Sequence, residues 1–166
     1  MDETTLSLHP PLAKCWMQRG EQKRIPTPGQ QERCHVFGAW DWHHDEVVWT
    51  VSTAKNSEAF MAFIEQLMLE QFPNDRIVLV MDNASFHHSG RSRAMLSLFD
   101  DRLLLYWLPP YCSVELNPIE RYWKHLKQQV CVNVLYPSLD DLTHSVTAEL
   151  ERQNEVDYKE RFLFSK

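Results

Sequence analysis

The stretch Arg76-Ile-Val-Leu-Val-Met-Asp82-Asn-Ala-Ser-Phe-His87 decides the predicted fold. Its five consecutive apolar residues, bounded by turn signals, predict a central β-strand that is buried on both faces and ends at Asp82. Open α/β sheets place their chemistry at the carboxyl ends of such strands, which makes Asp82 a candidate site residue. An Asp at this point is also a common way to open a loop and cap the next turn. The pattern leaves both interpretations of Asp82 open.

The segments on either side of this strand predict a mixed sheet with helices on its faces. Residues 34–42 and 46–52 are rich in aromatic and β-branched side chains and predict an antiparallel hairpin, with its turn at residues 43–45. In residues 57–72 the apolar positions recur every three or four residues, which predicts an amphipathic helix with Ser57 as its N-cap. The remaining predicted elements are a helix over 88–99, a buried strand over 103–108, and helices over 117–130 and 139–153, whereas residues 9–33 are mainly loop with at most one short strand, and the last dozen residues are frayed. The predicted class is α/β.

Length and charge limit the possible functions. The chain has 166 residues, the size of one domain with at most a small appendage, and a net charge of −6. Because nucleic-acid-binding domains usually carry excess Lys and Arg, any DNA contact needs a local basic patch or a separate basic domain. No apolar run reaches the roughly 20 residues of a membrane span, and the first residues do not resemble a signal peptide, so we expect a cytoplasmic protein.

Cysteine and histidine do not indicate a metal site by their spacing. Cys15, Cys34, Cys112 and Cys131 form no CxxC pair, and free buried thiols are the favoured interpretation. His87 and His88 could bind a metal ion, but adjacent histidines in a loop are more often solvated. The run from His43 to Glu46 is better explained as a hairpin turn.

Glu120 also has two interpretations. Asn117-Pro118-Ile119-Glu120 is a good helix start, with Asn117 as the N-cap and Glu120 reaching back in a capping box. On the helical wheel, Glu120 lies at the edge of the apolar face, on the same flank as Lys124 and Lys127. That position suits a metal ligand beside a phosphate track, and it suits a simple Glu–Lys pair equally well.

Several blocks, taken together and in order, resemble the DDE transposases, and in particular the bacterial insertion-sequence branch of the mariner-like superfamily. The blocks are Asp2-Glu-Thr-Thr-Leu6, Val36-Phe-Gly-Ala39, Val80-Met-Asp82-Asn-Ala-Ser-Phe-His87, Trp107-Leu-Pro-Pro-Tyr111 and Glu115-Leu-Asn-Pro-Ile-Glu120-Arg-Tyr-Trp123-Lys-His-Leu-Lys127. The resemblance implies an RNase H-like fold in which Asp2, Asp82 and Glu120 are the catalytic and metal-binding carboxylates. Two Mg²⁺ ions, with Mn²⁺ as a substitute, are the implied cofactors, and no small-molecule cofactor is expected. The expected DNA contacts are Lys124, Lys127, Arg121, Asn83 and His87.

The resemblance further implies metal-dependent cleavage of transposon-end DNA and strand transfer into target DNA, with a TA dinucleotide as the target. The expected partners are double-stranded DNA and a second copy of the chain bound on it. No membrane partner is expected, and the protein is expected to associate with the bacterial nucleoid while it is bound to DNA. The alternative is a catalytically inactive fragment that acts at most as a DNA- or protein-binding module. A housekeeping RNase H-like nuclease is a weaker third hypothesis, because the block ending at Glu120 and its trailing lysines are typical of transposases.

The expected organisation is a catalytic domain over residues 1–150 and a C-terminal tail over 151–166. In related proteins an apolar strand leads into the first catalytic Asp, whereas here only Met1 precedes Asp2. We therefore expect a truncated first strand, the absence of the family's N-terminal helix-turn-helix domain, and a poorly positioned Asp2. Since a misplacement of about 1 Å can cost a hundredfold in rate, weak or absent activity of the isolated chain is expected.

Overall fold

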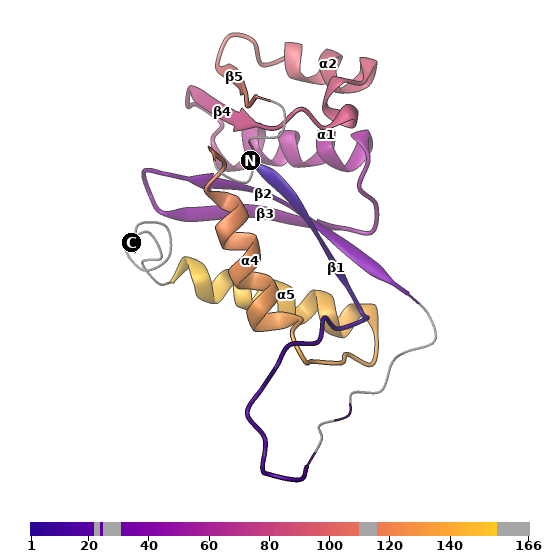
Figure 1. Cartoon of the computed structure of the whole chain (residues 1–166). Coiled ribbons are helices and arrows are strands. Elements are labelled where there is room, and N and C mark those ends of the chain that lie inside the picture. The colour runs from indigo at the N-terminus through magenta and orange to yellow at the C-terminus, as the bar shows by residue number, and fades with distance from the viewer. Residues whose placement is uncertain (22–23, 25–30, 110–115, 156–166) are drawn as a thin grey trace.

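The computed structural model describes residues 1–21, 24, 31–109 and 116–155. Figure 1 shows the arrangement of its elements. In chain order they are β1 (Asp2–Ser7), β2 (Arg33–Asp41), β3 (Glu46–Ser52), α1 (Ser57–Glu65), the π-helix η1 (Gln66–Gln71), β4 (Ile77–Met81), the 3₁₀-helix η2 (Ser85–His88), α2 (Gly90–Ser97), β5 (Leu103–Trp107), α4 (Ile119–Val130) and α5 (Leu139–Asn154).

The strands form an antiparallel group and a parallel pair. Strand β2 lies between β1 and β3, with Asp2 opposite Gly38 and Ser7 opposite Arg33 in the pairing with β1. Strands β4 and β5 pair in parallel. The amino group of Met1 donates a hydrogen bond to the carbonyl oxygen of Val80 at 2.7 Å. The start of β1 therefore lies against β4 and connects the two groups of strands.

The predicted hairpin is confirmed, and its turn explains the His-rich run. Asp45 adopts a left-handed conformation with φ of 60° and accepts a hydrogen bond from the indole N–H of Trp40. The carboxylate of Asp41 accepts hydrogen bonds from the backbone N–H groups of His43 and His44. These polar groups therefore close a turn, as the sequence predicts.

The first predicted helix is present, but its details differ. Its N-cap is Asn56 rather than Ser57, because the Asn56 side chain accepts a hydrogen bond from the backbone N–H of Ala59. The α-helix ends at Glu65 and continues as a π-helix to Gln71. Helices α2 and α5 confirm the other predicted segments, and α5 continues past residue 150 to Asn154.

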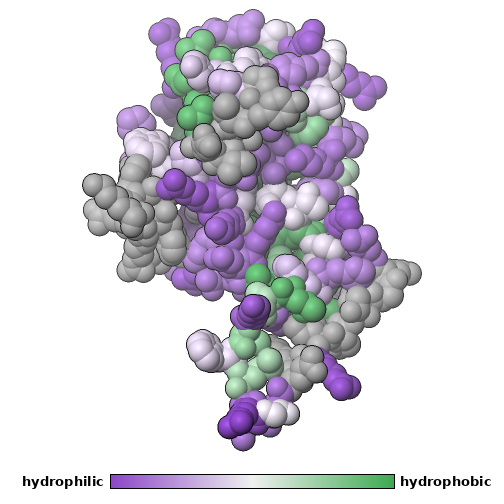
Figure 2. All heavy atoms as spheres, in the orientation of Figure 1, coloured by the Kyte–Doolittle hydropathy of each residue, from purple (hydrophilic) through white to green (hydrophobic). Residues whose placement is uncertain are grey.

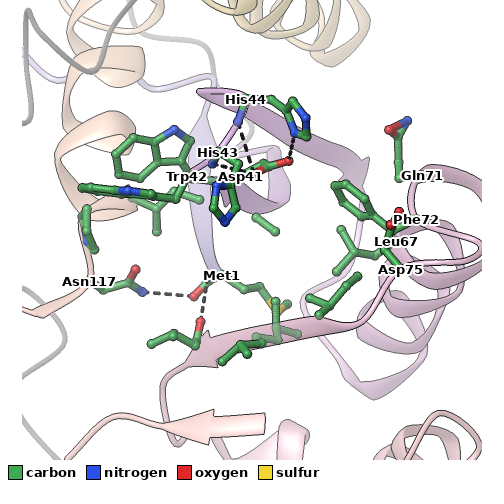
Figure 3. Close-up of a pocket in the computed structure, with 18 of the residues that line it drawn as sticks. Met1, Asp41, Trp42, His43, His44, Leu67, Gln71, Phe72, Asp75 and Asn117 are labelled. Atoms are coloured by element: carbon green, nitrogen blue, oxygen red, sulfur yellow. Dashed lines mark hydrogen bonds and ion pairs between the residues drawn. The ribbon is translucent and has the colours of Figure 1, made fainter. Parts of the chain in front are cut away.

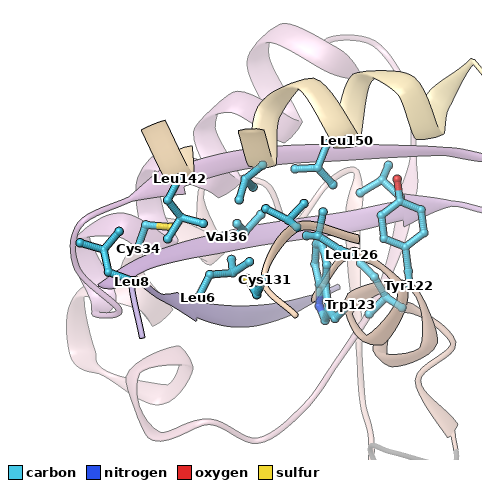
Figure 4. Packing of buried hydrophobic residues seen from close by; sticks show 14 residues of the cluster. Leu6, Leu8, Cys34, Val36, Tyr122, Trp123, Leu126, Cys131, Leu142 and Leu150 are labelled. Carbon is cyan, nitrogen blue, oxygen red and sulfur yellow. The ribbon is translucent and has the colours of Figure 1, made fainter. Parts of the chain in front are cut away.

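Two hydrophobic cores lie on opposite faces of the antiparallel strands. Successive strand residues point to opposite faces, so Val36 of β2 packs against α4 and α5 while the adjacent Phe37 packs with α1 and β4. Figure 4 shows the first core, in which Leu6, Leu126 and Leu142 meet between the strands and the two C-terminal helices. The arrangement is a layer of strands between two layers of helices.

The prediction that β4 and β5 are buried on both faces is wrong. Val78, Leu104 and Tyr106 are 62%, 65% and 61% exposed. Helices α1 and α2 lie on one side of this pair, and α4 and α5 lie across β1–β3, as Figure 1 shows. A continuous apolar run does not reveal that a strand lies at the side of a sheet, where one face lacks a covering helix.

Outside the regular elements, a long connection leaves β1 at Leu8. Its described residues contain no strand before Arg33, and Leu12, Trp16 and Met17 on it are exposed. Figure 2 shows this segment projecting below a mainly hydrophilic face. Of the cysteines, Cys34 and Cys131 are buried free thiols, Cys15 is exposed contrary to expectation, and Cys112 lies outside the described residues. No helix in the described part of the chain is long and apolar enough to cross a membrane.

Gly38 determines how closely α4 approaches the strands. A Cβ atom at this position would meet the Trp123 ring at 2.5 and 2.7 Å, far inside van der Waals contact. Trp123 is 2% exposed and belongs to the core between the strands and α4. The absence of a side chain at Gly38 therefore lets α4 lie directly over the residue that pairs with Asp2.

We expect Gly38→Ala to reduce the free energy of unfolding by roughly 1–3 kcal/mol, because the added methyl group overpacks the contact with Trp123. Urea denaturation would measure the change. Gly90→Ala is the matched control, since a Cβ there meets no atom within 4 Å. Combining Gly38→Ala with Trp123→Phe should recover part of the loss. Equal stability of Gly38→Ala and the parent would contradict this account.

Candidate active site

Strand β1 begins with two adjacent acidic residues that point to opposite faces. Asp2 shares its face with Leu6, which packs against α4 and α5. Glu3 shares its face with Met1, which packs in the core under α1 and β4. Both acids are buried, at 7% exposure each. The start of β1 therefore places one carboxylate on each face of the strand.

Asp2 lies within electrostatic range of both other predicted site carboxylates. Burial raises the pKa of Asp2 to about 7, and the negative charges of Glu120, Glu3 and Asp82 add to the increase. Asp2 pairs with Gly38 in β2, and Met1 forms hydrogen bonds through both its amino group and its carbonyl. Several negatively charged groups therefore lie near the start of β1.

Glu120 is carried to this position by α4. Trp123 packs over Gly38, and Glu120 lies three residues earlier on the same side of the helix. Asn117, which is buried, donates from its side-chain amide to the carbonyl oxygen of Met1 at 3.0 Å. This bond ties the residues that lead into α4 to the first residue of β1. Glu120 is half-buried.

The predicted capping box at this helix start is wrong. The N-cap is Pro118, and no side-chain capping bond forms there. The Asn117 side chain is used instead to bind Met1, a long-range partner that a local sequence pattern does not reveal. The alternative in which Glu120 serves only to cap its own helix therefore loses its support.

Asp82 has the turn-forming role that the sequence allows. Its Oδ1 atom accepts a hydrogen bond from the backbone N–H of Ala84 at 3.0 Å, directly after β4. A hydrogen bond from His87 lowers the pKa of Asp82, so its side chain is a carboxylate at neutral pH. The Asp82 side chain remains 33% exposed. It can therefore form the turn and still present an oxygen to a ligand.

His87 and Glu3 form a buried pair that supports Asp82. The Nε2 atom of His87 lies 2.9 Å from Glu3 Oε1, and its Nδ1 atom lies 3.4 Å from Asp82 Oδ1 and 3.2 Å from the Asp82 carbonyl oxygen. The side chains of Glu3 and His87 are each 1% exposed. Lys55 approaches the other oxygen of Glu3 at 3.5 Å. The expectation that His87 is solvated is wrong.

The sequence offered only a weak signal for this pair. Strand alternation places Glu3 on the face opposite Asp2, which is where the loop after β4 can reach it. Nothing in the sequence connects Lys55 with Glu3. His88 is half-buried, with its ring 4.4 Å from that of Trp107.

Glu3, Asp82 and His87 are the one group in the described chain whose possible ligand atoms all lie within 4.8 Å of one another. Both ring nitrogens of His87 face acceptor oxygens, so without a bound ion the ring carries a proton on each. Burial lowers the pKa of His87, but the hydrogen bonds to Asp82 and Glu3 outweigh it and raise the pKa to about 9. This cluster fixes Asp82 in place.

The other predicted DNA contacts lie on α4 and in the loop after β4. Arg121 and Lys124 are exposed on α4, and Lys127 is half-buried one turn further along. Asn83 is exposed, with its side-chain amide donating to the carbonyl oxygen of Leu108. The block from Pro110 to Glu115, which the sequence links to a cleft wall or a strand exit, lies outside the described residues.

Residues 1–143 match the family model for the DDE superfamily endonucleases. The chain belongs to that family. The match covers the strands, the Asp82 loop and α4, and so includes every carboxylate described above. The family membership predicted from the sequence blocks is confirmed.

Relatives of this DDE endonuclease domain occur in bacteria. It is 28% identical, over 150 residues, to the insertion element IS630 uncharacterized 39 kDa protein of Shigella sonnei, covering 90% of this chain and 43% of that protein. It is 25% identical to the uncharacterized protein y4pE/y4sA of Sinorhizobium fredii, over 69% of this chain and 81% of that one. The domain thus spans less than half the length of the insertion-element relative.

The fold of the domain resembles that of solved transposase structures. The Mos1 transposase paired-end complex with left transposon end matches with a TM-score of 0.62 at 14% identity, over 98% of this chain and 55% of the Mos1 chain. The Mos1 strand transfer complex matches with a TM-score of 0.61 at 14% identity, over 98% of this chain and 54% of that chain. The predicted RNase H-like α/β class is confirmed.

We expect Asp2→Asn to stabilise the metal-free domain above pH 7. The pKa of Asp2 is higher in the folded than in the unfolded chain, so its contribution to stability is present at low pH and is lost as the pH rises through about 7. The variant should gain about 2–4 kcal/mol at pH 8 and almost nothing at pH 4. Urea denaturation across this range, with Asp100→Asn as an exposed control, measures the difference. A gain that does not depend on pH would contradict the assignment.

We expect Glu3→Ala to lower the free energy of unfolding by roughly 3 kcal/mol, because it leaves the His87 ring buried beside an empty acceptor position. Glu3→Gln should lose less, since its amide oxygen can still accept from Nε2. Arg152→Ala is the control, because it removes an ion pair whose Arg is 51% exposed and should cost under about 1 kcal/mol. Equal losses in the alanine and glutamine variants would show that the hydrogen bond is not the stabilising contact.

Proposed function

We propose that this domain is the catalytic domain of a DNA transposase that cleaves transposon-end DNA and transfers the strand into target DNA. Asp2, Asp82 and Glu120 would hold two divalent cations, with Mg²⁺ as the natural ion and Mn²⁺ as a substitute. The proposal rests on the residues that the family blocks share and on the electrostatics of Asp2.

The observation that carries the proposal is the position of Asp2, a buried acid that pairs with Gly38 under α4. A protein gains no stability from burying a carboxyl group among the charges of Glu120, Glu3 and Asp82. A divalent cation would compensate those charges, and hard cations such as Mg²⁺ prefer carboxylate oxygens. The donor set thus fits the proposed ions in both charge and ligand type.

The surrounding residues would prepare these carboxylates for binding. His87 and Ala84 hold the Asp82 carboxylate, while Asn117 and Trp123 hold the start of α4 against β1. Asp2 must lose a proton before it can act as a ligand, so ion binding would release a proton. Two bound ions supply activation of the attacking oxygen and stabilisation of the leaving oxygen in phosphoryl transfer.

DNA would lie along the exposed side of α4. Arg121 and Lys124 are exposed there and could contact phosphates next to the Glu120 carboxylate. With a net charge of −6, the chain has few other means of attracting DNA, so most of the affinity would have to come from elsewhere in a longer protein or from a second copy on the DNA. Double-stranded DNA and a homodimer remain the proposed partners, and association with the nucleoid would follow from binding DNA.

The alternative function is a non-catalytic module that binds DNA or a partner transposase. The buried Glu3–His87 pair favours the catalytic function. Apolar residues of similar volume would stabilise the protein as well as this buried charged pair, or better. A non-catalytic fragment would therefore gain nothing from a charged pair behind Asp82.

We expect Asp82→Asn and Glu120→Gln to lower Mg²⁺-dependent nicking of terminal-repeat DNA by at least about a hundredfold, because each substitution removes an anionic ligand but keeps the side-chain shape. The measurement uses the domain within a chain of the length of its insertion-element relative, with product analysis on gels. Asp140→Asn, in the first turn of α5, is the control. Parent-level nicking by both variants would show that these carboxylates do not carry the reaction.

Ion binding can be tested on the domain alone. Titration with Mn²⁺, followed by electron paramagnetic resonance, should show binding by the parent and at least about a tenfold loss of affinity in each of the two variants. Binding that is unchanged by both substitutions would place the ions elsewhere.

A further inference from the structure

A pocket of about 320 Å³ lies between α2 and β5, beside the loop that carries Asp82. Figure 1 shows α2 and β5 at one end of the molecule, away from α4 and α5. We call this space the Trp107 pocket, after the residue that ends β5 and lines it. Asp2, Asp82 and Glu120 do not line the Trp107 pocket, so it is separate from the proposed ion site.

Two walls of the Trp107 pocket come from regular elements. Arg93, Leu96 and Ser97 follow one another at three and four residues, so they share one face of α2. Leu105 and Trp107 are alternate residues of β5 and share one face of that strand. Leu96 is buried and Leu105 is half-buried, whereas Arg93 and Ser97 are exposed. The pocket therefore has an apolar interior and a polar rim.

The third wall of the pocket is aromatic. The His88 ring centroid lies 4.4 Å from that of Trp107, with 35° between the two ring planes, and the His87 ring lies 6.3 Å from Trp107. Trp107 and His88 are each half-buried, so part of their ring surface stays open to the pocket. Because flat π-systems stack on one another, this wall suits a flat heteroaromatic ligand.

The pocket adjoins the proposed ion site through His87. The Nδ1 atom of His87 lies 3.4 Å from Asp82 Oδ1, and the same ring lines the pocket. The Nε2 atom of His88 lies 3.3 Å from the Oδ1 atom of Asn83, the residue that follows Asp82. A DNA strand with a phosphate at Asp82 would therefore bring one of its bases to the mouth of the pocket.

Hydrogen bonds hold the pocket and the ion site in one unit. The backbone N–H of Leu108, next to Trp107, donates to the carbonyl oxygen of Met81, next to Asp82, at 2.9 Å. On the other side of β4, Met1 bonds to β4 and to the Asn117 side chain, as Figure 3 shows. The distance from the pocket to the carboxylates is thus fixed by the fold.

We propose that the Trp107 pocket binds an unpaired nucleobase of the DNA strand whose phosphate lies at Asp82. This inference rests on the proposed function, which brings such a strand to the site. The base would leave the duplex stack and lie against the Trp107 and His88 rings. At the rim, Arg93 would contact the phosphate of the same nucleotide, and Asp100 would accept a hydrogen bond from the base edge.

Such a contact would determine which nucleotide of the strand reaches the ions. Stacking on an aromatic ring is available to every base, so the pocket would select an unpaired position rather than a particular sequence. A base that is mismatched or already single-stranded would enter most readily, because less pairing and stacking is lost.

The test uses the domain without metal ions at low salt. The probe is a short single-stranded oligonucleotide with one 2-aminopurine among abasic sites, and the same oligonucleotide with abasic sites alone is the matched control. The base-containing probe should bind at least about tenfold more tightly, the gain expected from one base–aromatic stack. Its fluorescence should fall on binding, because stacking on an aromatic ring quenches 2-aminopurine.

Variants locate the bound base. Trp107→Leu keeps the wall apolar but removes the ring, so it should abolish the quenching, and Trp107→Phe should retain most of it. Arg93→Ala should weaken binding at least about threefold more than Arg91→Ala does. Both arginines are exposed on α2, but only Arg93 lines the pocket, so Arg91→Ala controls for the loss of charge.

Equal binding of the two oligonucleotides, or no binding of the base-containing one, would overturn the proposal. Quenching that survives Trp107→Leu, or equal effects of the two arginine substitutions, would overturn it as well. Binding of the free 2-aminopurine deoxynucleotide as tight as that of the oligonucleotide would also overturn it, by showing a site for free nucleotides.

Failure of this proposal can be told apart from failure of the proposed function. Tight, base-dependent binding by a chain that does not nick terminal-repeat DNA would overturn only the transposase activity. Nicking without any preference for the base-containing probe would overturn only the Trp107 pocket.

Discussion

The placement of acidic side chains at the start of β1 is the constraint on which the rest of the site depends. Asp2 and Glu3 are adjacent in the chain and both are buried, yet strand geometry sends them to opposite faces. Glu3 meets His87 and Lys55, so its charge is compensated within the protein. The charge of Asp2 is instead disfavoured by burial and by the negative charges of Glu120, Glu3 and Asp82, which raise its pKa. One structural rule thus places the two adjacent acids in different environments.

Two close contacts fix the position of α4 relative to β1. The missing side chain of Gly38 lets Trp123 lie on β2 opposite Asp2, and the amide of Asn117 binds the carbonyl of Met1. Together they fix the first turn of α4, and with it Glu120, relative to β1. Asp82 is fixed separately, by its own turn and by His87. The three carboxylates are therefore held by packing and hydrogen bonds within the protein.

The sequence predicts the helices and strands well, but it predicts poorly which side chains and helices surround them. Periodicity and composition identified the hairpin, α5 and the strand before Asp82, because those signals are local. The Asn117 side chain was assigned to a helix cap and instead binds a residue 116 positions away. His87 was expected in solvent and lies between two acids. Both differences arise from long-range contacts, which a local pattern of residue types cannot encode. The exposed face of β4 was missed for a related reason, since strand composition does not tell which helices cover it.

The net negative charge of the chain is easier to reconcile with DNA chemistry when the buried acidic residues are considered separately from the exposed surface. Part of the net charge of −6 comes from buried acids that no DNA phosphate could approach directly. Phosphates could approach Asp2, Asp82 and Glu120 only with cations between them, because like charges repel strongly in a partly buried setting. Ion binding and DNA binding would then depend on each other. Arg121 and Lys124 could orient a strand along α4, but the ions would have to supply the attraction at the carboxylates themselves.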